Sequence, residues 1–335
     1  MNAQRRHALA RAAALAVLAM PWSSAVLAQA AAIRPPAKTS KLAGTLRIVV
    51  PANAGGGWDQ TGRALGTALV GAGAADQVEY ENVGGKGGTI GLAHYAEKYA
   101  NDPNTLLIGG MVMVGAVALQ KPAVDLAQIQ SIARLTSDYL VAAVPASSPL
   151  RTAKDLVAAM RANLPAVPVA GGSAGGVDHI FTGVLARAAK ANPEALVYRP
   201  FPGGTEVVNA LLTGKAAVGL SGYSEFSDAI AAGKLRAIGL SARRSLFGLP
   251  AFREQGVDAV MANWRGVFTG KGVPAARLAE MVGAVEAATA HESWLRTLKQ
   301  NRWDASWLAG KDLTEFIELD LTTARVMVYL LKLKT

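Results

Sequence analysis

The chain has no cysteine and only four histidines among its 335 residues. Without cysteine it can form no disulfide framework, offer no thiolate to zinc and carry no lipid on a cysteine at an export cleavage site. His94, His179 and His291 stand far apart, and no pair of histidines or group of carboxylates has the spacing of metal ligands. We therefore expect neither a bound metal ion nor a disulfide.

The chain also lacks any run of like charge, although its formal net charge is +10. Nucleic-acid binding requires Lys and Arg gathered into a patch with aromatic side chains that stack on bases, and aromatic residues make up only 6% of this sequence. The excess of basic residues is spread along the chain. These features exclude a nucleic acid as the partner and are compatible with a small anionic ligand.

No apolar run is long enough to span a bilayer, which requires about 20 residues. The first 30 residues instead combine Arg5, Arg6 and Arg11 with a short apolar stretch and with small residues at Ala28 and Ala30. This pattern predicts a secretory signal peptide over residues 1–30, cleaved near Ala28 or Ala30, and hence a periplasmic protein. The Arg pair leaves both the general and the twin-arginine export route open.

Glycine, by contrast, is abundant, with 35 residues. It is concentrated in three loops, Pro51–Asp59, Asn82–Gly91 and Gly171–His179, each of which follows a short β-branched run and precedes a helical pattern. Glycine lets the backbone approach a ligand closely, and N–H groups at the start of a helix attract anions. The three loops therefore predict a site for an anion.

Short apolar runs alternate with amphipathic segments along the rest of the chain. Strands are predicted over 46–50, 78–81, 106–109, 132–136, 140–145, 167–170, 196–199, 217–220, 235–241 and 263–269. Helices are predicted over 58–70, 90–99, 152–163, 177–190, 205–213, 224–232, 275–290, 291–300 and 311–331. Such alternation is typical of an α/β architecture with largely parallel sheets, and we interpret residues 31–43 as a flexible leader.

The unit of strand, glycine loop and helix occurs in both halves of the chain, over residues 49–70 and 167–190. Two domains that face each other across a cleft would explain this recurrence, and such clefts commonly bind small molecules. Three helix boundaries are also indicated by local chemistry. Thr152 and Asp155 have the spacing of a capping box, and Gly214 and Gly233 can end helices in a left-handed conformation.

A nucleotide cofactor is the first alternative reading of the glycine loops. The run Gly55–Gly62 does not supply the Gly-x-Gly-x-x-Gly spacing, and Trp58 stands where a pyrophosphate would need close approach. The chain has no Gly-x-x-x-x-Gly-Lys-Ser/Thr motif either. We therefore expect no cofactor.

A serine hydrolase is the second alternative, because Gly171–Gly175 matches the Gly-x-Ser-x-Gly pattern around Ser173. That chemistry requires an acid and then a histidine downstream, and His291 is the only histidine after His179. We interpret Ser173 as a hydroxyl donor to a ligand oxygen, and a secreted hydrolase remains the alternative.

Three further polar residues of the loops have both a structural and a ligand-binding reading. Asp178 and His179 could form a local pair at the start of a helix or contact the ligand. Asp59 is expected to be a first-turn acid that is stabilised by the helix dipole and bonded to loop amides, so that it fixes the first glycine loop.

Taken together, the motifs resemble those of a known family. The matching segments, in order, are 46–51, 55–59, 81–82, 84–91, 102–107, 132–135, 171–179, 237–241, 254–256 and 263–268. They are similar to the periplasmic solute-binding receptors of tripartite tricarboxylate transporters, the Bug or TctC family. The resemblance covers essentially the whole chain after the signal peptide.

This resemblance implies a type II periplasmic-binding-protein fold, or Venus flytrap, in which two α/β domains close on a carboxylate. Domain 1 would comprise residues 44–143 and 267–335, domain 2 residues 144–266, with crossovers near 141–147 and 263–269. It also implies a monomer without enzymatic activity, which captures a di- or tricarboxylate such as citrate. The partner would be the permease subunits of the transporter, with a membrane-bound sensor kinase as an alternative.

The motifs carried over from the family, together with the loops, predict contacts to the ligand through backbone amides and small hydroxyl groups. The predicted ligand-binding residues are Gly55, Gly56, Gly57, Trp58, Asp59, Gly87, Gly88, Thr89, Met111, Gly172, Ser173, Ala174, Gly175, Asp178, His179, Ser221 and Tyr223. The sequence departs from many family members at Lys86 and in the third loop. These departures leave the identity of the acid open.

Overall fold

The structure, a computed structural model, describes residues 41–333, which belong to one compact unit that begins at Pro36. The predicted signal peptide and the leader up to residue 40 lie outside the described residues. The first strand begins at Ala43, and Leu42 before it is already buried. The folded chain thus starts slightly earlier than the sequence indicates.

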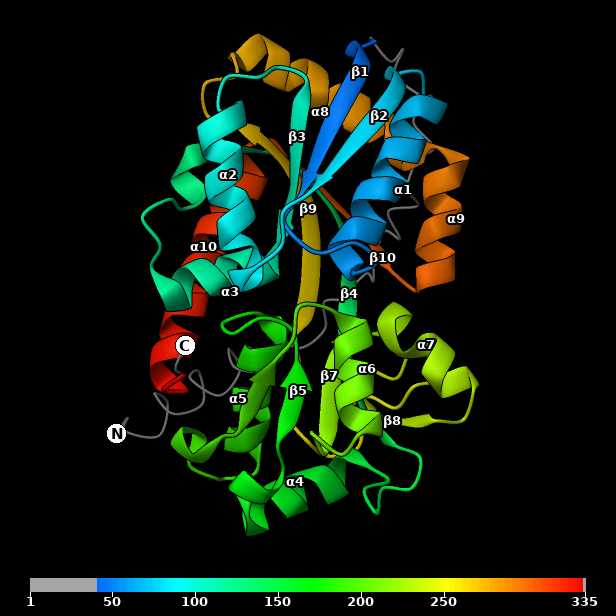
Figure 1. Ribbon diagram of the computed structural model, residues 1–335, viewed down its shortest axis with the longest axis vertical. Helices are drawn as coiled ribbons and strands as arrows, with labels where there is room; N and C mark the ends of the chain where they lie inside the picture. Colours follow the sequence, from blue (N-terminus) through cyan, green and yellow to red (C-terminus); the bar gives the residue numbers. More distant parts are fainter. Residues whose placement is uncertain (1–40, 334–335) are drawn as a thin grey trace, which may run out of the picture. The chain divides into compact units, whose positions relative to one another are not determined.

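Helices and strands alternate along the described chain, as predicted (Figure 1). The strands are β1 (Ala43–Val50), β2 (Ala75–Asn82), β3 (Thr105–Gly110), β4 (Ile129–Pro145), β5 (Val169–Gly171), β6 (Tyr198–Pro200), β7 (Val218–Gly222), β8 (Leu235–Leu240), β9 (Ala262–Gly270) and β10 (Asp304–Ala309). The helices are α1 (Gly57–Gly71), α2 (Thr89–Tyr99), α3 (Met111–Gln120), α4 (Ala153–Ala162), α5 (Val177–Ala188), α6 (Gly204–Leu212), α7 (Tyr223–Ala231), α8 (Ala275–Ala290), α9 (Glu292–Asn301) and α10 (Gly310–Leu330). Short 3₁₀ turns are η1 (Lys86–Gly88), η2 (Leu126–Gln128), η3 (Leu164–Ala166) and η4 (Pro193–Ala195).

Two groups of parallel strands are joined by β4. In the first group β2, β1 and β3 run parallel, followed by β9 and β4, with β10 paired to the outer side of β4. In the second group β6, β5 and β7 run parallel, followed by the end of β4, which also pairs with β8. We call these the first lobe and the second lobe, each with its own helices. The two α/β lobes agree with the fold class that the sequence predicts.

The strand that joins the lobes changes its partners in the middle. Residues up to Tyr139 of β4 pair with β9 of the first lobe, whereas residues from Leu140 on pair with β7 and β8 of the second lobe. All of β9 pairs within the first lobe. The limits of the two domains themselves stay a prediction.

The structure differs from the sequence-based expectation in three elements. One continuous strand, β4, replaces the two strands expected over 132–136 and 140–145. Helix α3 and strand β10 were not expected. The sheet is also mixed, because β9, β4, β8 and β10 run antiparallel to the strands they pair with.

Local chemistry sets several helix ends as predicted. Thr152 Oγ1 accepts a hydrogen bond from Asp155 N over 3.1 Å, and Asp155 Oδ2 accepts one from Thr152 N over 3.0 Å, which completes the capping box of α4. Gly214 and Gly233 have φ values of +70° and +68° after α6 and α7. Both values lie in the left-handed region that glycine adopts without strain.

The interior is continuous between the elements of the first lobe. All residues of β3 are buried, and they belong to the same buried cluster as apolar side chains of β1, α1 and α8. Helix α10 packs on α3 and β4. Beyond its last turn, Leu331 reaches Gly183 of α5, where a Cβ would lie 2.9 Å from Leu331 Cδ1. The C-terminal segment therefore contacts both lobes.

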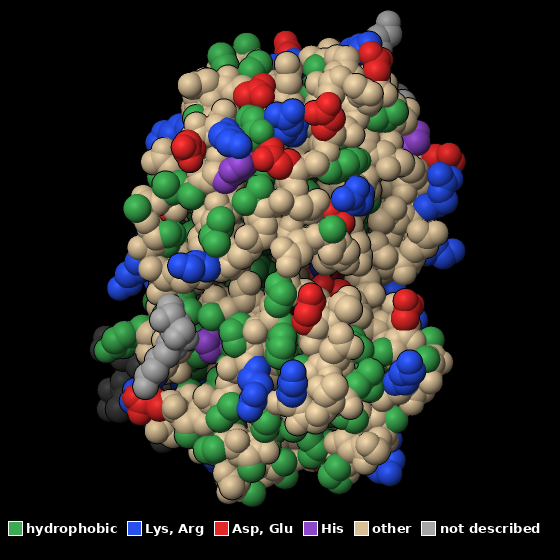
Figure 2. Space-filling view, viewed as in Figure 1, with side chains coloured by type: hydrophobic (Ala, Val, Ile, Leu, Met, Phe, Trp, Pro, Cys, Tyr) green, Lys and Arg blue, Asp and Glu red, His purple; other side chains and the backbone are tan. Residues whose placement is uncertain are grey.

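The surface fits the spread of charge in the sequence. On the face seen in Figure 2, side chains of both signs are scattered over both lobes, and the surface is hollowed between them. Within residues 41–333, no helix combines the length and apolar character that crossing a bilayer would require.

Candidate functional site

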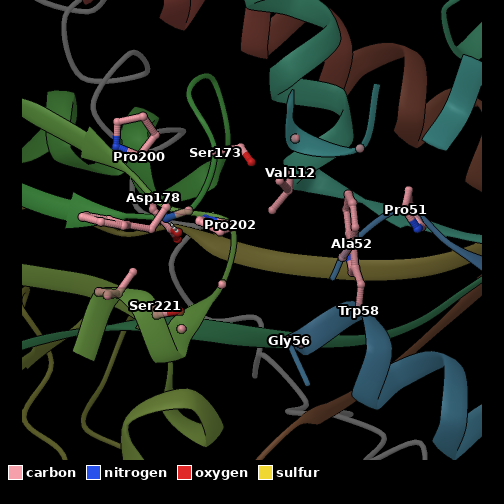
Figure 3. Close-up of a pocket in the computed structure, with 18 of the residues that line it drawn as sticks. Pro51, Ala52, Gly56, Trp58, Val112, Ser173, Asp178, Pro200, Pro202 and Ser221 are labelled. Atoms are coloured by element: carbon pink, nitrogen blue, oxygen red, sulfur yellow. Dashed lines mark hydrogen bonds between the residues drawn. The ribbon is translucent and has the colours of Figure 1, made fainter. Parts of the chain in front are cut away.

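A cavity of about 640 Å³ lies between the two lobes, and both contribute to its walls (Figure 3). Its lining residues are Pro51, Ala52, Gly56, Gly57, Trp58, Gly85, Lys86, Gly87, Gly88, Val112, Gln120, Gly172, Ser173, Ala174, Asp178, Pro200, Phe201, Pro202, Gly203, Gly204, Val207, Ser221, Gly222, Glu225, Asn263 and Arg265. The volume suits a small molecule, and glycine-rich backbone from all three predicted loops faces it.

The predicted site residues fall into two sets. Those that line the cavity are Gly56, Gly57, Trp58, Gly87, Gly88, Gly172, Ser173, Ala174, Asp178 and Ser221. Those that lie outside the lining are Gly55, Asp59, Thr89, Met111, Gly175, His179 and Tyr223. In the second set, Asp59, Thr89 and His179 form hydrogen bonds that support the loops, as described below.

The first loop leads into α1, and Asp59 fixes it. Asp59 Oδ2 accepts hydrogen bonds from Gly55 N and Arg63 Nε, both over 2.9 Å, and Oδ1 accepts one from Asn82 Nδ2 over 3.0 Å. Burial opposes the charge of this carboxylate, but the three bonds hold the pKa of Asp59 below its usual value. As the sequence predicts, the charged Asp59 side chain links the first loop to the first turn of α1. Gly56, Gly57 and Trp58 face the cavity.

The second loop owes its shape to four consecutive residues with positive φ. These are Gly85 at +124°, Lys86 at +47°, Gly87 at +66° and Gly88 at +90°. Lys86 is the one member for which this conformation is unfavourable. Its carbonyl oxygen accepts hydrogen bonds from Thr89 Oγ1 over 3.0 Å and from Gln120 Nε2 over 2.9 Å. Thr89 therefore holds the loop in place, and Lys86 itself lines the cavity.

The third loop is held by Asp178 in α5. Asp178 is buried, and its Oδ2 accepts a hydrogen bond from Gly172 N over 2.6 Å. Burial raises the pKa of Asp178 to about 7; the nearby carboxylates of Glu225 and Asp138 act in the same direction, and the Gly172 N–H opposes them. The side chain both closes the loop and faces the cavity.

His179 lies behind this loop. Its Nδ1 accepts a hydrogen bond from Gly175 N over 3.1 Å, and its ring stacks on Tyr198 with 4.2 Å between the ring centroids. Burial lowers the pKa of His179 to about 4, so the imidazole is neutral at pH 7. The structure thus supports the reading of His179 as a locally satisfied histidine.

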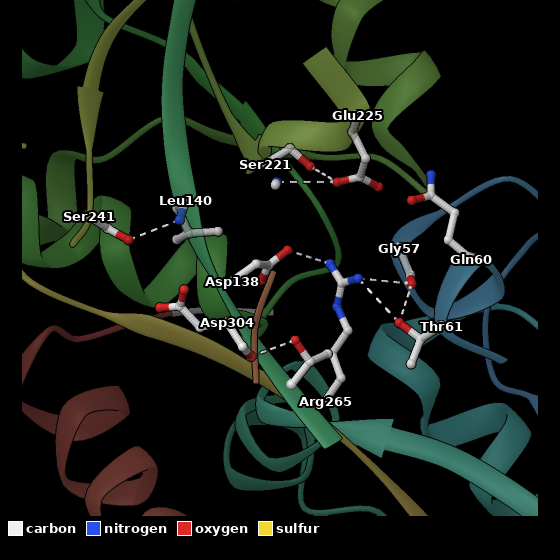
Figure 4. Close-up of polar contacts among 12 residues, drawn as sticks. Gly57, Gln60, Thr61, Asp138, Leu140, Ser221, Glu225, Ser241, Arg265 and Asp304 are labelled. Carbon is white, nitrogen blue, oxygen red and sulfur yellow. Dashed lines mark hydrogen bonds and ion pairs between the residues drawn. The ribbon is translucent and has the colours of Figure 1, made fainter. Parts of the chain in front are cut away.

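Arg265 of β9 is the charged lining residue that sequence reasoning did not place in the site (Figure 4). It is 2% exposed, and its Nη2 donates to Asp138 Oδ2 over 2.5 Å. Its Nη1 donates to Gly57 O over 3.0 Å and to Thr61 Oγ1 over 3.2 Å. Arg265 therefore ties the start of α1 to β4. A basic residue inside an apolar strand pattern was the signal that could have pointed to it.

Arg265 compensates the buried charge of Asp138. Burial raises the pKa of Asp138 to about 6, while the guanidinium acts to lower it. Because the pair is buried together, the loss of either member would leave an uncompensated charge in the floor of the cavity.

The first turn of α7, which directly follows β7, supplies Glu225, another residue that sequence reasoning missed. Glu225 Oε2 accepts hydrogen bonds from Ser221 Oγ and, over 3.3 Å, from Gly222 N. Tyr223, which was predicted to contact the ligand, instead packs its ring under Arg302, with 3.8 Å between the ring centroid and Cζ. A fourth loop with two glycines, Pro200–Gly204, also lines the cavity and was not singled out in the sequence.

The cavity does not assemble a hydrolytic triad or a metal site from the part of the chain that is described. Among residues 41–333, Ser173 Oγ has no hydrogen bond to a histidine or a carboxylate, and His179 faces Gly175 instead. In the same residues there is no cluster of three or more His, Asp or Glu side chains that could hold a metal ion. The arrangement offers amides, hydroxyls and charged groups that can bind a small polar molecule.

Comparisons with known proteins agree with this geometry. The family model described as the tripartite tricarboxylate transporter family receptor matches residues 71–332. A relative from Pseudomonas sp. strain P51, the UPF0065 protein in the tcbD-tcbE intergenic region, is 27% identical over 270 residues, which are 75% of this chain and 76% of the relative.

Several solved structures share the fold. The periplasmic binding protein BugD is 20% identical with a TM-score of 0.78, over 87% of this chain and 98% of BugD. MatC from Rhodopseudomonas palustris, solved with bound malate, is 21% identical with a TM-score of 0.73, over 85% and 98% of the two chains. An adipate-bound R. palustris protein is 18% identical with a TM-score of 0.79, over 87% and 98%.

The solved structures establish that the two lobes form a periplasmic-binding-protein fold, and the family model spans most of the described residues. The chain belongs to the tripartite tricarboxylate transporter receptor family, a family of solute-binding receptors that serve transporters.

Proposed function

We propose that this protein is a periplasmic receptor that captures a small organic acid between its lobes and delivers it to the permease subunits of a tripartite transporter. The observation that carries this proposal is that glycine-rich loops of both lobes face one cavity of about 640 Å³. Export would depend on residues 1–30, and we expect the exported protein to act as a monomer.

The carboxylate is expected to lie against the first and second loops, near Gly57 and Gly88, and to reach Ser173 of the second lobe. Each hydrogen bond to a charged group contributes about 1.5–3 kcal/mol, so a few of them suffice for micromolar affinity after ordering costs. Because such a ligand contacts both lobes, it stabilises the closed arrangement over an open one. The permease would then recognise the closed form.

The kind of acid is a separate question. The sequence-based expectation is a di- or tricarboxylate such as citrate, and the structures with malate and adipate hold dicarboxylates in relatives of this chain. Backbone N–H groups of the loops can donate to any carboxylate, so citrate itself remains a prediction. A membrane-bound sensor kinase is the alternative partner, and capture of candidate membrane proteins by the ligand-loaded receptor would distinguish it from a permease.

The proposal is tested by native mass spectrometry of the purified protein, which should detect a co-purifying organic acid, followed by titration calorimetry with that acid. We expect saturable binding of one molecule per chain without turnover. Ser173→Ala should weaken binding by about tenfold, the equivalent of roughly 1.4 kcal/mol. Ser227→Ala is a matched control, since Ser227 on α7 lies outside the lining and bonds Ser224 O.

The hydrolase alternative predicts a different outcome. It requires covalent labelling of Ser173 by a fluorophosphonate probe and release of product from an ester. Such labelling, or a bound neutral sugar in place of an acid, would contradict the receptor proposal.

A further inference from the structure

The two walls of the cavity differ in charge. The first lobe contributes the backbone of Gly56, Gly57, Gly87 and Gly88 together with Lys86, whereas the second lobe contributes the carboxylates of Asp178 and Glu225. Building on the receptor function above, we propose that the ligand is an amino acid or a similar amino carboxylate, whose cationic nitrogen is bound by Asp178 and Glu225.

Asp178 offers a free acceptor to the cavity. The residue is 8% exposed, and only its Oδ2 is engaged, by Gly172 N. Its other oxygen accepts no hydrogen bond from residues 41–333. A carboxylate so deeply buried is stabilised by a cation or by donors at its second oxygen. Figure 3 shows Asp178 directed into the cavity from the second lobe.

Glu225 approaches from the other side of the same wall. Ser221 and Gly222 both donate to its Oε2. Its Oε1 lies 3.9 Å from the position that a Cβ on Gly56 would occupy, so this oxygen extends across the cavity toward the first lobe. The ammonium group of a ligand has three N–H donors and could reach both carboxylates.

Asn263 provides a second, independent sign of a missing donor. It lines the cavity and is 7% exposed, and its Oδ1 has no hydrogen-bond partner in the described structure. Buried side-chain oxygens are nearly always paired, so a donor from the ligand or its bound water is expected at this position. An ammonium group could supply this donor directly, whereas a ligand carboxylate could do so only through a water molecule.

Arg265 does not neutralise the carboxylates of Asp178 and Glu225. Arg265 is engaged by Asp138, Gly57 and Thr61. Its charge is balanced by Asp138, which leaves Asp178 and Glu225 without a paired cation among the lining residues of the second lobe. Lys86 belongs to the opposite wall, in the second glycine loop. A second carboxylate on the ligand would therefore meet like charge, whereas an ammonium group would meet opposite charge.

Calorimetric titration of the full exported protein at pH 8 with matched pairs of ligands tests this assignment. One pair is 5-aminopentanoate and adipate, which have the same length and differ in one terminal group. The other is aspartate and malate, which differ in an ammonium or hydroxyl group. We expect the amino member of a pair to bind at least about tenfold more tightly, because opposite charges attract in the partly buried site.

Variants separate the acidic wall from the rest of the cavity. Asp178→Asn and Glu225→Gln should each remove most of the preference for the amino compound and leave the affinity for the paired plain acid equal or higher. Glu254→Gln is the control, since this second-lobe carboxylate is bonded to Ser245 and lies outside the lining. It should leave the preference unchanged.

The outcomes distinguish this inference from the function on which it rests. Tighter binding of adipate and malate than of their amino counterparts would overturn the inference and leave the receptor function standing. Uptake of a proton with the dicarboxylate, measured in buffers of different ionisation enthalpy, would do the same and would assign Asp178 as a protonated donor. Binding of neither member of either pair would overturn the inference, and it would contradict the receptor function as well only if the protein also bound no co-purifying acid.

Discussion

Gly57 lies where the first glycine loop meets Arg265. A Cβ at this position would lie 2.6 Å from Arg265 Nη2 and 2.9 Å from Cζ, too close for any side chain. The guanidinium needs this space because it bonds the carbonyl oxygen of the same residue. Glycine is thus required here by a neighbour and not by backbone conformation.

We expect Gly57→Ala to displace the Arg265 guanidinium and to weaken ligand binding by about tenfold or more, because the ion pair with Asp138 and the start of α1 would both shift. Titration calorimetry measures the loss. Gly283→Ala on α8 is the matched control, since nothing lies within 4 Å of its added Cβ. The control should keep its affinity; an equal loss in both variants would refute the role of the guanidinium.

Asp178 makes the stability of the ligand-free protein depend on pH. Its pKa rises from the ordinary value of 3.8 to about 7 on folding because of burial. Between these values the folded protein binds more protons than the unfolded chain, so the free energy of unfolding falls as the pH rises.

Asp178→Asn should therefore stabilise the ligand-free protein more at pH 8 than at pH 4, where the native side chain is already neutral, by about 4 kcal/mol, the free energy that corresponds to a rise of the pKa from 3.8 to about 7. The asparagine Oδ1 can still accept the bond from Gly172 N. Urea denaturation at the two pH values measures the difference. Equal effects at both would mean that folding does not raise the pKa of Asp178.

At the scale of elements, the helix boundaries are the part of the fold that the sequence determines locally. The capping box of α4 involves two exposed residues three positions apart, so its chemistry can be read without tertiary information. Thr152→Ala should lower the free energy of unfolding by about 1 kcal/mol, the usual value for an N-cap. Thermal denaturation measures it, and ligand affinity should not change.

A suitable control for that prediction is Thr314→Ala in α10. Thr314 is exposed, and its hydroxyl donates to the carbonyl oxygen of Gly310 over 3.4 Å within the helix and caps nothing. Its effect should stay within about 0.5 kcal/mol, as for most surface substitutions. If the two variants lost equal stability, the hydroxyl at position 152 would not be acting as a cap.

Elements that depend on distant partners were harder to predict. Helix α3 was missed because its sequence, Met111–Gln120, is apolar on nearly every side, and such a run shows no helical periodicity. Strand β10 was missed because it is defined by pairing with β4, more than 160 residues earlier in the chain. The antiparallel course of β9 likewise follows from its pairing with β3 and not from its own pattern.

The same reasoning explains which parts of the site the sequence predicted. The glycine loops could be predicted because the glycines, the preceding strand and the following helix are neighbours in the sequence. Residues of all three loops line the cavity. Arg265 reaches the cavity through β9 and bonds Gly57, which lies far away in the chain. Glu225 reaches it through α7, and its Oε1 comes near Gly56, which is also far away in the chain. Such contacts become visible only when the chain is folded.

At the scale of the whole described chain, one contact between the lobes is formed by two glycines outside the lining of the cavity. A Cβ on Gly115 of α3 would lie 2.2 Å from the carbonyl oxygen of Gly175 in the third loop. Gln120 Nε2 at the end of the same helix lies 3.5 Å from Ala174 O. The first lobe therefore contacts the third loop by backbone, with no room for a side chain.

If ligand capture requires this approach, Gly115→Ala should hold the lobes apart. We expect the affinity for the co-purifying acid to fall by about tenfold or more, whereas the ligand-free protein keeps its stability or gains up to about 1 kcal/mol from the better helix former. Calorimetry measures the affinity, and small-angle scattering should register a ligand-induced decrease in radius of gyration in the parent protein but not in the variant.

Gly283→Ala, which also replaces a helical glycine, should behave like the parent in both measurements. The new methyl group would lie 2.2 Å from the carbonyl oxygen of Gly175, which a close-packed interior does not allow. An unchanged affinity in Gly115→Ala would therefore mean that the acid is bound without contact between α3 and the third loop.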